Sequence, residues 1–305
     1  MNQEKPKIIV ILGPTASGKT DLSIKLAKHF NGQIVSADSR QIYKYMDLGT
    51  GKISKKEMQN IKHYMLNIIT PDKKFSVGQY KKEAISCIKK ILKEKRLPFL
   101  VGGSAMYIYS IIKGWEFPET KIDWDKRKEL EQKPIEELLK LLKQLDPRRY
   151  DTVQKENKRR IIRAIEIAEQ LGNVPEIKNN PEFDCLLIGI KKEGEELRKA
   201  IRKRMVKRIK QGMIEEIKNL HDKKHISWEQ LEAFGLEYRW ISRFLQNKII
   251  EKEMLFHLEA DIWRFSGHQM NWFKKDKNIH WINSSIQAKK LINDFIQIKP
   301  NKING

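Results

Sequence analysis

The strongest constraint on this chain lies near its N-terminus, where residues 8–20 read IIVILGPTASGKT. The apolar run 8–12 predicts a buried parallel strand, Gly13 to Thr20 has the spacing Gly-x-x-x-x-Gly-Lys-Thr, and an amphipathic helix is expected directly after it. In such a loop, backbone N–H groups converge on one point at a helix N-terminus, which favours a bound phosphate group. Lys19 would add a positive charge for phosphate oxygens, and the Thr20 hydroxyl is a natural ligand for Mg²⁺. The alternative is an ordinary surface turn.

Strands and helices continue to alternate beyond this loop. Strands are expected near 33–37, 64–69, 98–101 and 185–191, and helices begin after the N-cap residue Ser76 and from Ser104. Between 116 and 183 the alternation stops, and segments such as EELLKLLKQL and NKRRIIRAIEIAEQL predict helices only. We therefore predict an α/β fold in which residues 1–115 and 184–305 form a parallel sheet flanked by helices, similar to P-loop NTPases. Residues 116–183 would form an all-α insertion domain.

Two polar segments follow predicted strands and should lie near the phosphate-binding loop, because ligands bind at the carboxyl ends of parallel strands. Asp38 ends the second strand, and Gly102-Gly103-Ser104 ends the strand at 98–101. A helix N-cap is the alternative interpretation of Asp38. The strand at 98–101 ends in glycine, whereas phosphate-loop enzymes that hydrolyse nucleotides usually carry an acid there to hold Mg²⁺ and water. This difference weakens an ATPase interpretation.

The formal net charge of +22 favours a polyanionic partner. Lysine and arginine cluster at 148–163 and 191–210, where Arg159, Arg160 and Arg163 would share a helix face. A solvated face is the alternative, although arginine is the better residue for phosphate or RNA contact. Arg204 lies beside an apolar stripe that we expect in the core, and its side chain could reach the cleft. Aromatic residues between 260 and 282 fit either base stacking or burial under a C-terminal helix.

The composition also indicates the cellular compartment in which the protein works. The sequence has no run of 18 apolar residues, so no membrane span is expected, and the polar MNQEKPK start does not resemble a signal peptide. The two cysteines, Cys87 and Cys185, have apolar neighbours, which is typical of free thiols in a reducing cytoplasm.

Seven motifs, spread in order over nearly the whole length, resemble the bacterial tRNA dimethylallyltransferase family. They are GPTASGKT (13–20), SADSRQIYKYMDLGTGK (36–52), FSVGQY (75–80), LVGGSAMY (100–107), NKRRIIRAIEI (157–167), QGMIEEI (211–217) and FGLEYR, with a later WF and HWI. The resemblance implies prenyl transfer from dimethylallyl diphosphate to the exocyclic amine of adenosine 37, just 3′ of a tRNA anticodon. The products would be isopentenyladenosine and diphosphate.

By this resemblance, Asp38 accepts the proton of the amine and the Ser104 hydroxyl assists near the amine or the diphosphate. Mg²⁺ is the implied cofactor, held at Thr20, and the implied protein is a cytoplasmic monomer. The residues implied to bind diphosphate are Gly13, Pro14, Thr15, Ala16, Ser17, Gly18, Lys19, Thr20, Arg163 and Arg204. The residues implied to contact tRNA are Asp38, Ser39, Arg40, Gln41, Ser104, Arg127, Arg159, Arg160 and Arg163.

The sequence departs from the family pattern at two motifs that are linked with tRNA contact. The usual A-x-G-Y-K-E is here AFGLEY (233–238), and the usual K-R-Q-x-x-W is here GHQMNW (267–272). Three other functions remain open at this point: an isopentenyltransferase acting on free AMP or ATP, a small-molecule kinase, and an RNA-binding protein with a degenerate nucleotide site. The first of these has no need of a basic insertion, and the intact Gly-Lys-Thr with Asp38 argues against the last.

Overall fold

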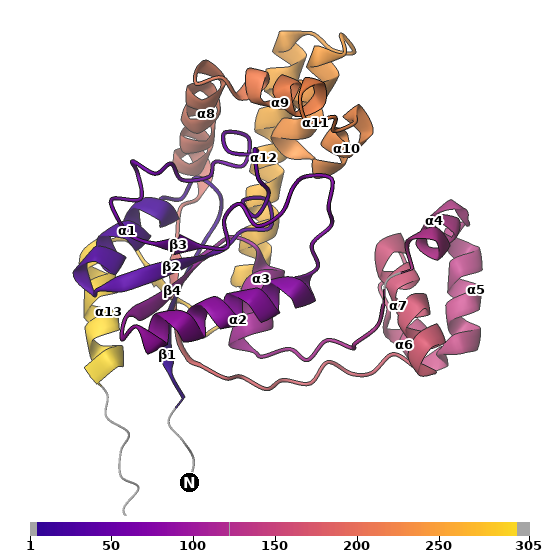
Figure 1. The fold of residues 1–305 in the computed structure, drawn as a ribbon, viewed down its shortest axis with the longest axis horizontal. Coiled ribbons are helices and arrows are strands. Elements are labelled where there is room, and N and C mark those ends of the chain that lie inside the picture. The colour runs from indigo at the N-terminus through magenta and orange to yellow at the C-terminus, as the bar shows by residue number, and fades with distance from the viewer. Residues whose placement is uncertain (1–4, 122, 298–305) are drawn as a thin grey trace, which may run out of the picture. The chain divides into compact units, whose positions relative to one another are not determined.

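A computed structural model describes residues 5–121 and 123–297, and these residues divide into two compact units. The first consists of residues up to Lys113 and from Pro181, and the second is Gly114–Asn180 (Figure 1). The sequence placed the boundaries of the insertion at 116 and 183. The strands are β1 Lys7–Leu12, β2 Gly32–Ala37, β3 His63–Tyr64, β4 Leu97–Gly102, β5 Asp184–Ile190 and β6 His280–Ile282. The helices are α1 Lys19–His29, α2 Val77–Lys93, α3 Ala105–Ile112, α4 Trp124–Gln132, α5 Ile135–Leu145, α6 Pro147–Thr152, α7 Lys158–Leu171, α8 Gly194–Lys210, α9 Met213–Asp222, α10 Trp228–Phe234, α11 Leu236–Leu245, α12 Glu251–Phe273 and α13 Ser285–Gln297.

The described strands form one six-stranded sheet in the order β3-β2-β4-β1-β5-β6, and every pairing is parallel. Residues 8–12 of the central strand β1 are fully buried, as expected for a strand covered on both faces. Ile9 and Ile11 pack in a cluster with residues of α1 and α13, such as Ile24 and Ile292. Helices α2 and α3 lie on the other side of the sheet (Figure 1). The predicted α/β fold is therefore confirmed.

The strand order brings the predicted site segments to one edge of the sheet. Strand β4 pairs with both β1 and β2, so the segments that follow these three strands are neighbours. They are the glycine-rich loop at 13–18, Asp38, and the glycine pair before Ser104. Gly102 fits closely here, since a Cβ on it would lie 2.0 Å from the Ala37 carbonyl oxygen.

Local sequence signals explain most helix boundaries. Ser76 accepts from the Gln79 N–H while the Gln79 side chain accepts from the Ser76 N–H, which is a capping box that starts α2. The long basic segment breaks into α8 and α9 at Gly212, whose φ of 100° suits glycine. None of the described helices is long and apolar enough to cross a membrane.

One expectation about a strand was wrong. The strand expected near 64–69 ends at Tyr64, because Met65 and Asn67 have φ values of 61° and 56° and turn the chain out of the sheet. The HWI segment forms the edge strand β6 and pairs with β5. Trp281 packs so closely over Gly189 that a Cβ there would lie 2.6 Å from the indole ring, so this tryptophan serves the fold.

The second unit has its own core, built from α4, α5, α6 and α7. Leu138, Leu142, Ile161 and Ile165 are fully buried in it. Asp146 starts α6 by accepting from the Arg149 N–H at 2.9 Å, and its other oxygen accepts from the Val174 N–H at 2.8 Å. This buried carboxylate therefore fixes the segment after α7 to the start of α6.

Candidate active site

The glycine-rich loop at 13–18, which the sequence predicts to bind phosphate, connects β1 to α1. Gly13, Ala16 and Gly18 all have positive φ, at 148°, 61° and 95°. A Cβ on Gly13 would lie 2.8 Å from the Ile190 carbonyl oxygen of β5, so only glycine fits. Because Gly18 is the N-cap of α1 and has no side chain, the first-turn N–H groups face outward to a ligand. The Ser17 hydroxyl is buried and has no hydrogen-bond partner among the described residues.

Lys19 folds back over this loop. Its Nζ donates to the Pro14 carbonyl oxygen at 2.6 Å. Burial, and to a lesser degree the positive charge of Arg204, lower the pKa of Lys19 to about 7, while Asp38 opposes the shift. A bound phosphate group would stabilise the ammonium form of this buried lysine, because it places a negative charge beside the positive one.

Two residues that are distant in sequence complete the loop at Thr15. The Arg204 guanidinium of α8 donates to the Thr15 hydroxyl, and burial, with Arg208 nearby, lowers its pKa to about 10. Gln269 of α12 accepts from the Thr15 N–H at 2.8 Å and donates to the Gly103 carbonyl oxygen at 3.0 Å. One amide thus joins the loop after β1 to the loop after β4.

Asp38 lies at the end of β2 and shares a cavity of about 90 Å³ with Lys19, Thr20 and Arg204. Its Oδ1 accepts from the N–H groups of Arg40 at 2.9 Å and Gln41 at 3.4 Å, which caps a turn. No described helix begins here, so the helix N-cap interpretation is wrong. The carboxylate therefore holds its own turn while it lines the same cavity as the phosphate-binding loop.

Ser104 and the segment 39–41 surround Asp38. The Ser104 hydroxyl accepts from the Ser39 N–H at 3.0 Å and donates to the Ser39 hydroxyl at 3.3 Å, which fixes residue 39 beside the carboxylate. The Arg40 guanidinium lies 5.2 Å from the centre of the Phe234 ring, and burial lowers its pKa. The Gln41 side chain contacts the Ser36 hydroxyl and the Gly51 carbonyl oxygen, both at 3.3 Å.

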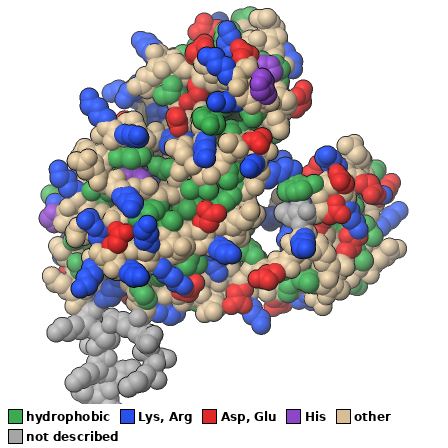
Figure 2. All heavy atoms as spheres, viewed as in Figure 1, with side chains coloured by type: hydrophobic (Ala, Val, Ile, Leu, Met, Phe, Trp, Pro, Cys, Tyr) green, Lys and Arg blue, Asp and Glu red, His purple; other side chains and the backbone are tan. Residues whose placement is uncertain are grey.

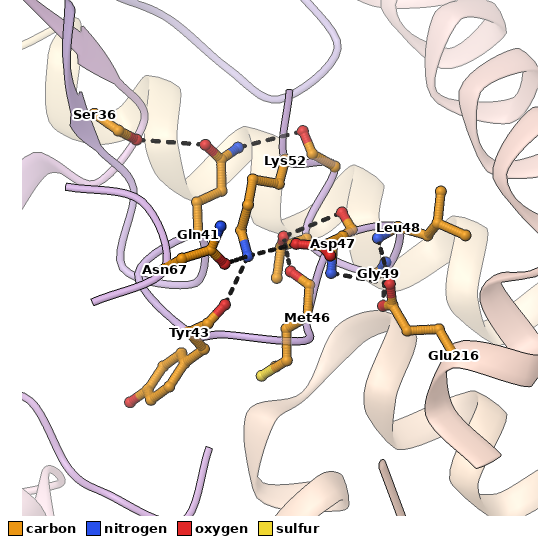
Figure 3. Close-up of polar contacts among 12 residues, drawn as sticks. Ser36, Gln41, Tyr43, Met46, Asp47, Leu48, Gly49, Lys52, Asn67 and Glu216 are labelled. Carbon is orange, nitrogen blue, oxygen red and sulfur yellow. Dashed lines mark hydrogen bonds and ion pairs between the residues drawn. The ribbon is translucent and has the colours of Figure 1, made fainter. Parts of the chain in front are cut away.

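A loop at 46–53 forms the opposite wall and is drawn in Figure 3. Thr50, Gly51 and Ile53 line the cavity that contains Asp38. The same loop also borders a second, larger cleft of about 400 Å³, whose other walls are residues 16–21 and the basic side of α8. The buried Lys52 ammonium fixes the base of the loop, since it donates to the Tyr43 carbonyl oxygen at 2.6 Å and to Asp47 and Asn67 at 2.7 Å (Figure 3).

The predicted arginines of the second unit fall into two kinds. Arg127 donates from Nε to the buried Glu166 at 2.6 Å and forms a second, shorter bond from Nη2. Arg163 donates to the same carboxylate at 3.2 Å and to the Thr120 hydroxyl at 2.7 Å. Arg159 and Arg160 are exposed on α7, where Arg160 donates to the side chain of Gln154 at 3.1 Å and neither has a described bond to a buried carboxylate. The first pair thus has internal partners, which sequence reasoning did not anticipate, and the roles of all four toward diphosphate or tRNA stay predictions.

Sequence reasoning also missed Gln269 and Glu216. The segment GHQMNW (267–272) differs from the usual family motif K-R-Q-x-x-W but keeps its glutamine, which is Gln269. That retained glutamine could have indicated a functional role. Glu216 lies in the QGMIEEI motif, but nothing in the sequence indicates that its partner is the loop at 46–53. The aromatic residues of α12 divide between the two expected interpretations: Phe273 is buried, whereas Trp263 and Phe265 are partly exposed.

A family model described as IPP transferase matches residues 41–276, which is most of the chain. The chain belongs to the IPP transferase family. The resemblance inferred from the motifs is therefore confirmed.

This chain matches curated relatives over almost their full length. The tRNA dimethylallyltransferase of Acetivibrio thermocellus is 39% identical over 290 residues, which are 90% of this chain and 91% of that protein. The enzyme of the same name from Alkaliphilus oremlandii is 37% identical over 294 residues, 92% of each chain.

Solved structures of related proteins have a similar fold. The tRNA isopentenylpyrophosphate transferase of Bacillus halodurans matches with a TM-score of 0.71 and 31% identity, covering 96% of both chains. A eukaryotic dimethylallyltransferase acting on tRNA matches with a TM-score of 0.85 over 98% of this chain and 81% of its own. At 24% identity, this second likeness concerns the fold alone.

Proposed function

We propose that this protein transfers a dimethylallyl group from dimethylallyl diphosphate to the exocyclic amine of adenosine 37 of tRNA. The observation that carries the proposal is the shared cavity, in which a phosphate-binding loop with Lys19 faces the carboxylate of Asp38 in a member of this family. A kinase can also pair such a loop with a carboxylate base, so membership of the IPP transferase family is what favours prenyl transfer over phosphate transfer. The relatives' names, which specify tRNA as acceptor, support the same reaction.

In the proposed reaction, a bond forms between the adenine nitrogen and C1 of the dimethylallyl group while the bond from C1 to the diphosphate oxygen breaks. The diphosphate leaves with the electron pair of that bond, and the nitrogen gives its proton to Asp38. The first-turn N–H groups of α1, Lys19 and Arg204 stabilise the negative charge that develops on the leaving group. Gln269 holds the loop at Thr15 to the loop at Gly103, so the two sides of the proposed site keep their spacing.

Mg²⁺ is part of the proposal, with the Thr20 hydroxyl as its protein ligand. The described residues contain no group of three or more His, Cys, Asp or Glu side chains suited to a metal, so a cage made of protein alone does not fit. A hydroxyl next to a bound diphosphate does fit, because Mg²⁺ keeps most of its waters and takes few protein oxygens. When bound, the ion would neutralise diphosphate charge.

We further propose that the tRNA contacts include Ser39, Arg40 and Gln41 beside Asp38, together with Ser104 and the second-unit residues Arg127, Arg159, Arg160 and Arg163. The basic composition supports a polyanionic substrate, and lysine and arginine side chains are spread over the face of the protein in Figure 2. With tRNA as the substrate, the expected compartment is the cytoplasm. The expected state, taken from the family resemblance alone, is a monomer.

The test incubates the protein with labelled dimethylallyl diphosphate and Mg²⁺, together with either tRNA or AMP. We expect the label on tRNA, and nuclease digestion followed by mass spectrometry should locate it on the adenosine 3′ of the anticodon. Label on AMP and none on tRNA would contradict the proposal in favour of a free-nucleotide prenyltransferase. Phosphate transfer from ATP to a small acceptor, without prenylation, would favour a kinase.

A further inference from the structure

The carboxylate of Glu216, on α9, is surrounded by backbone N–H groups of a distant loop. Its Oε2 accepts from the N–H groups of Asp47 at 2.9 Å and Leu48 at 2.6 Å, and its Oε1 accepts from the Gly49 N–H at 2.9 Å (Figure 3). The Tyr238 hydroxyl also donates to Oε1, at 3.2 Å. Three consecutive N–H groups that converge on one point form a backbone nest, which is a binding site for an anion. Here the protein supplies that anion from its own side chain.

The glycines of the loop fit closely against helices α8 and α11. A Cβ on Gly49 would lie 2.5 Å from the Tyr238 hydroxyl oxygen, and a Cβ on Gly51 would lie 1.4 Å from an Arg208 nitrogen. Arg208 is itself buried and paired with the buried Glu237 at 3.4 Å. The loop therefore rests on a rigid surface, and Glu216 is the charged group that holds it there.

The position of this loop decides the width of the substrate site. Gly51 and Ile53 border both the cavity with Asp38 and the larger cleft, and in both they face Lys19 and Thr20. The Gly51 carbonyl oxygen also accepts from Gln41, which links the loop to the turn that carries Asp38. A small outward shift of residues 47–51 would therefore widen the space in which a diphosphate substrate lies.

We propose that Glu216 is a positioning residue that fixes the 46–53 loop opposite the phosphate-binding loop and thereby sets the affinity for dimethylallyl diphosphate. The inference rests on the proposed function for the identity of this substrate. Glu216 touches no reacting atom, and the loop carries none of the groups assigned to the chemical step. Its loss should consequently weaken substrate binding more than it slows the bound reaction.

The test replaces Glu216 by glutamine, which keeps the shape of the side chain but turns one acceptor oxygen into a donor that repels the N–H groups. We expect KM for dimethylallyl diphosphate to rise about tenfold while kcat stays within about threefold of the parent protein. The dissociation constant for tRNA should change less than KM, since Gln41 is the one proposed tRNA contact with a described hydrogen bond to this loop. Hydrogen exchange at the amides of residues 47–49 should accelerate, because their acceptor is lost.

Glu215→Gln is the matched control. Glu215 is the exposed neighbour on the same helix, and its carboxylate accepts from the Asn219 side chain, one turn further along α9, at 3.2 Å. The same chemical change at this position should alter neither KM nor the exchange of residues 47–49. An equal effect of both substitutions would overturn the proposal, since it would trace the change to the charge of α9 in general.

Gly49→Ala tests the same contact from the side of the loop and serves if Glu216→Gln fails to fold. The added methyl group meets the Tyr238 hydroxyl and should lift the loop, so KM should rise in the same way. The double variant should be non-additive, with a KM close to that of the worse single variant. Additive effects, or a KM within about twofold of the parent in both single variants, would refute the role of Glu216.

Failure of this inference is distinguishable from failure of the proposed function. If the parent protein prenylates no tRNA, the proposed function is wrong, whatever the variants do. In that case, hydrogen exchange and the affinity for dimethylallyl diphosphate measured by calorimetry still test the positioning role of Glu216, because neither measurement needs turnover. Unchanged exchange at 47–49 in Glu216→Gln would sink the inference even in an active enzyme.

Discussion

Asp38 uses a single carboxylate for a structural contact and for the proposed chemistry, and substitutions can separate the two. Oδ1 accepts from the N–H groups of Arg40 and Gln41. An asparagine side chain at this position would keep the acceptor oxygen and lose the proton-accepting group, so Asp38→Asn should lower the rate of prenyl transfer by about 10² to 10⁴. Single-turnover kinetics measure this rate, and thermal unfolding and tRNA affinity should stay near those of the parent.

Asp38→Ala provides the comparison, because it removes the turn contact as well. It should be at least as slow and also less stable than Asp38→Asn. If the asparagine variant loses tRNA binding in parallel with its rate, Asp38 is a binding contact and the proposed proton transfer to it is wrong.

Lys19 gives the site a pH dependence whose sign is fixed by the structure. Its pKa falls from 10.5 to about 7, so between these values the folded protein binds fewer protons than the unfolded chain and its stability rises with pH. A bound diphosphate supplies negative charge and raises this pKa again. We therefore expect binding of dimethylallyl diphosphate at pH 8 to take up a proton, and the affinity to weaken as the pH rises above 7.

Calorimetry in buffers of different ionisation enthalpy measures this proton uptake directly. Lys19→Gln, which cannot titrate, is the control and should remove most of the buffer dependence. The same binding enthalpy in all buffers for the parent protein would show that Lys19 does not change its protonation on binding and would contradict the prediction.

At the scale of elements, the arginines in and around helix α7 have different surroundings, since some pair with a buried carboxylate and others are exposed. Arg127 of α4 pairs with Glu166 of α7, which is only 3% exposed, so this contact joins two helices of the second unit. Removal of Arg127 leaves Glu166 with Arg163 alone, and Arg127→Ala should destabilise the protein by about 2 to 3 kcal/mol. Thermal and denaturant unfolding of the full chain measure the loss.

Arg159→Ala is the matched substitution on the exposed face of α7. It should leave the unfolding midpoint unchanged and weaken tRNA binding. If Arg127→Ala unfolds at the same temperature as Arg159→Ala, the buried ion pair does not stabilise the second unit.

The elements were largely predictable, since hydrophobic periodicity and capping residues act locally. The apolar run of β1, the Ser76 cap of α2 and the break at Gly212 each follow from a few adjacent residues. The end of β3 was not predictable, because Met65 and Asn67 adopt left-handed backbone, which residues other than glycine seldom do, and the contacts of Asn67 are with Gln41 and Lys52. The same limit applies in the site: the sequence indicates Lys19 and Asp38, but the backbone groups that contact Gln269 and Glu216 lie more than 160 residues away.

At the scale of the whole molecule, the formal charge of +22 and the proposed tRNA substrate make binding dependent on salt. Each contact between a basic side chain and an RNA phosphate releases counterions, so the logarithm of the association constant should fall steeply and linearly with the logarithm of salt concentration. The double variant Arg159→Ala, Arg160→Ala should reduce this slope by about 0.7 to 0.9 for each lost phosphate contact. Filter binding over a range of salt concentrations measures the slope, with Lys95→Ala as a control at the opposite, amino end of the sheet. A slope near zero in the parent protein would mean that its excess charge does not meet RNA phosphates, and an unchanged slope in the double variant would remove the exposed face of α7 from the docking surface.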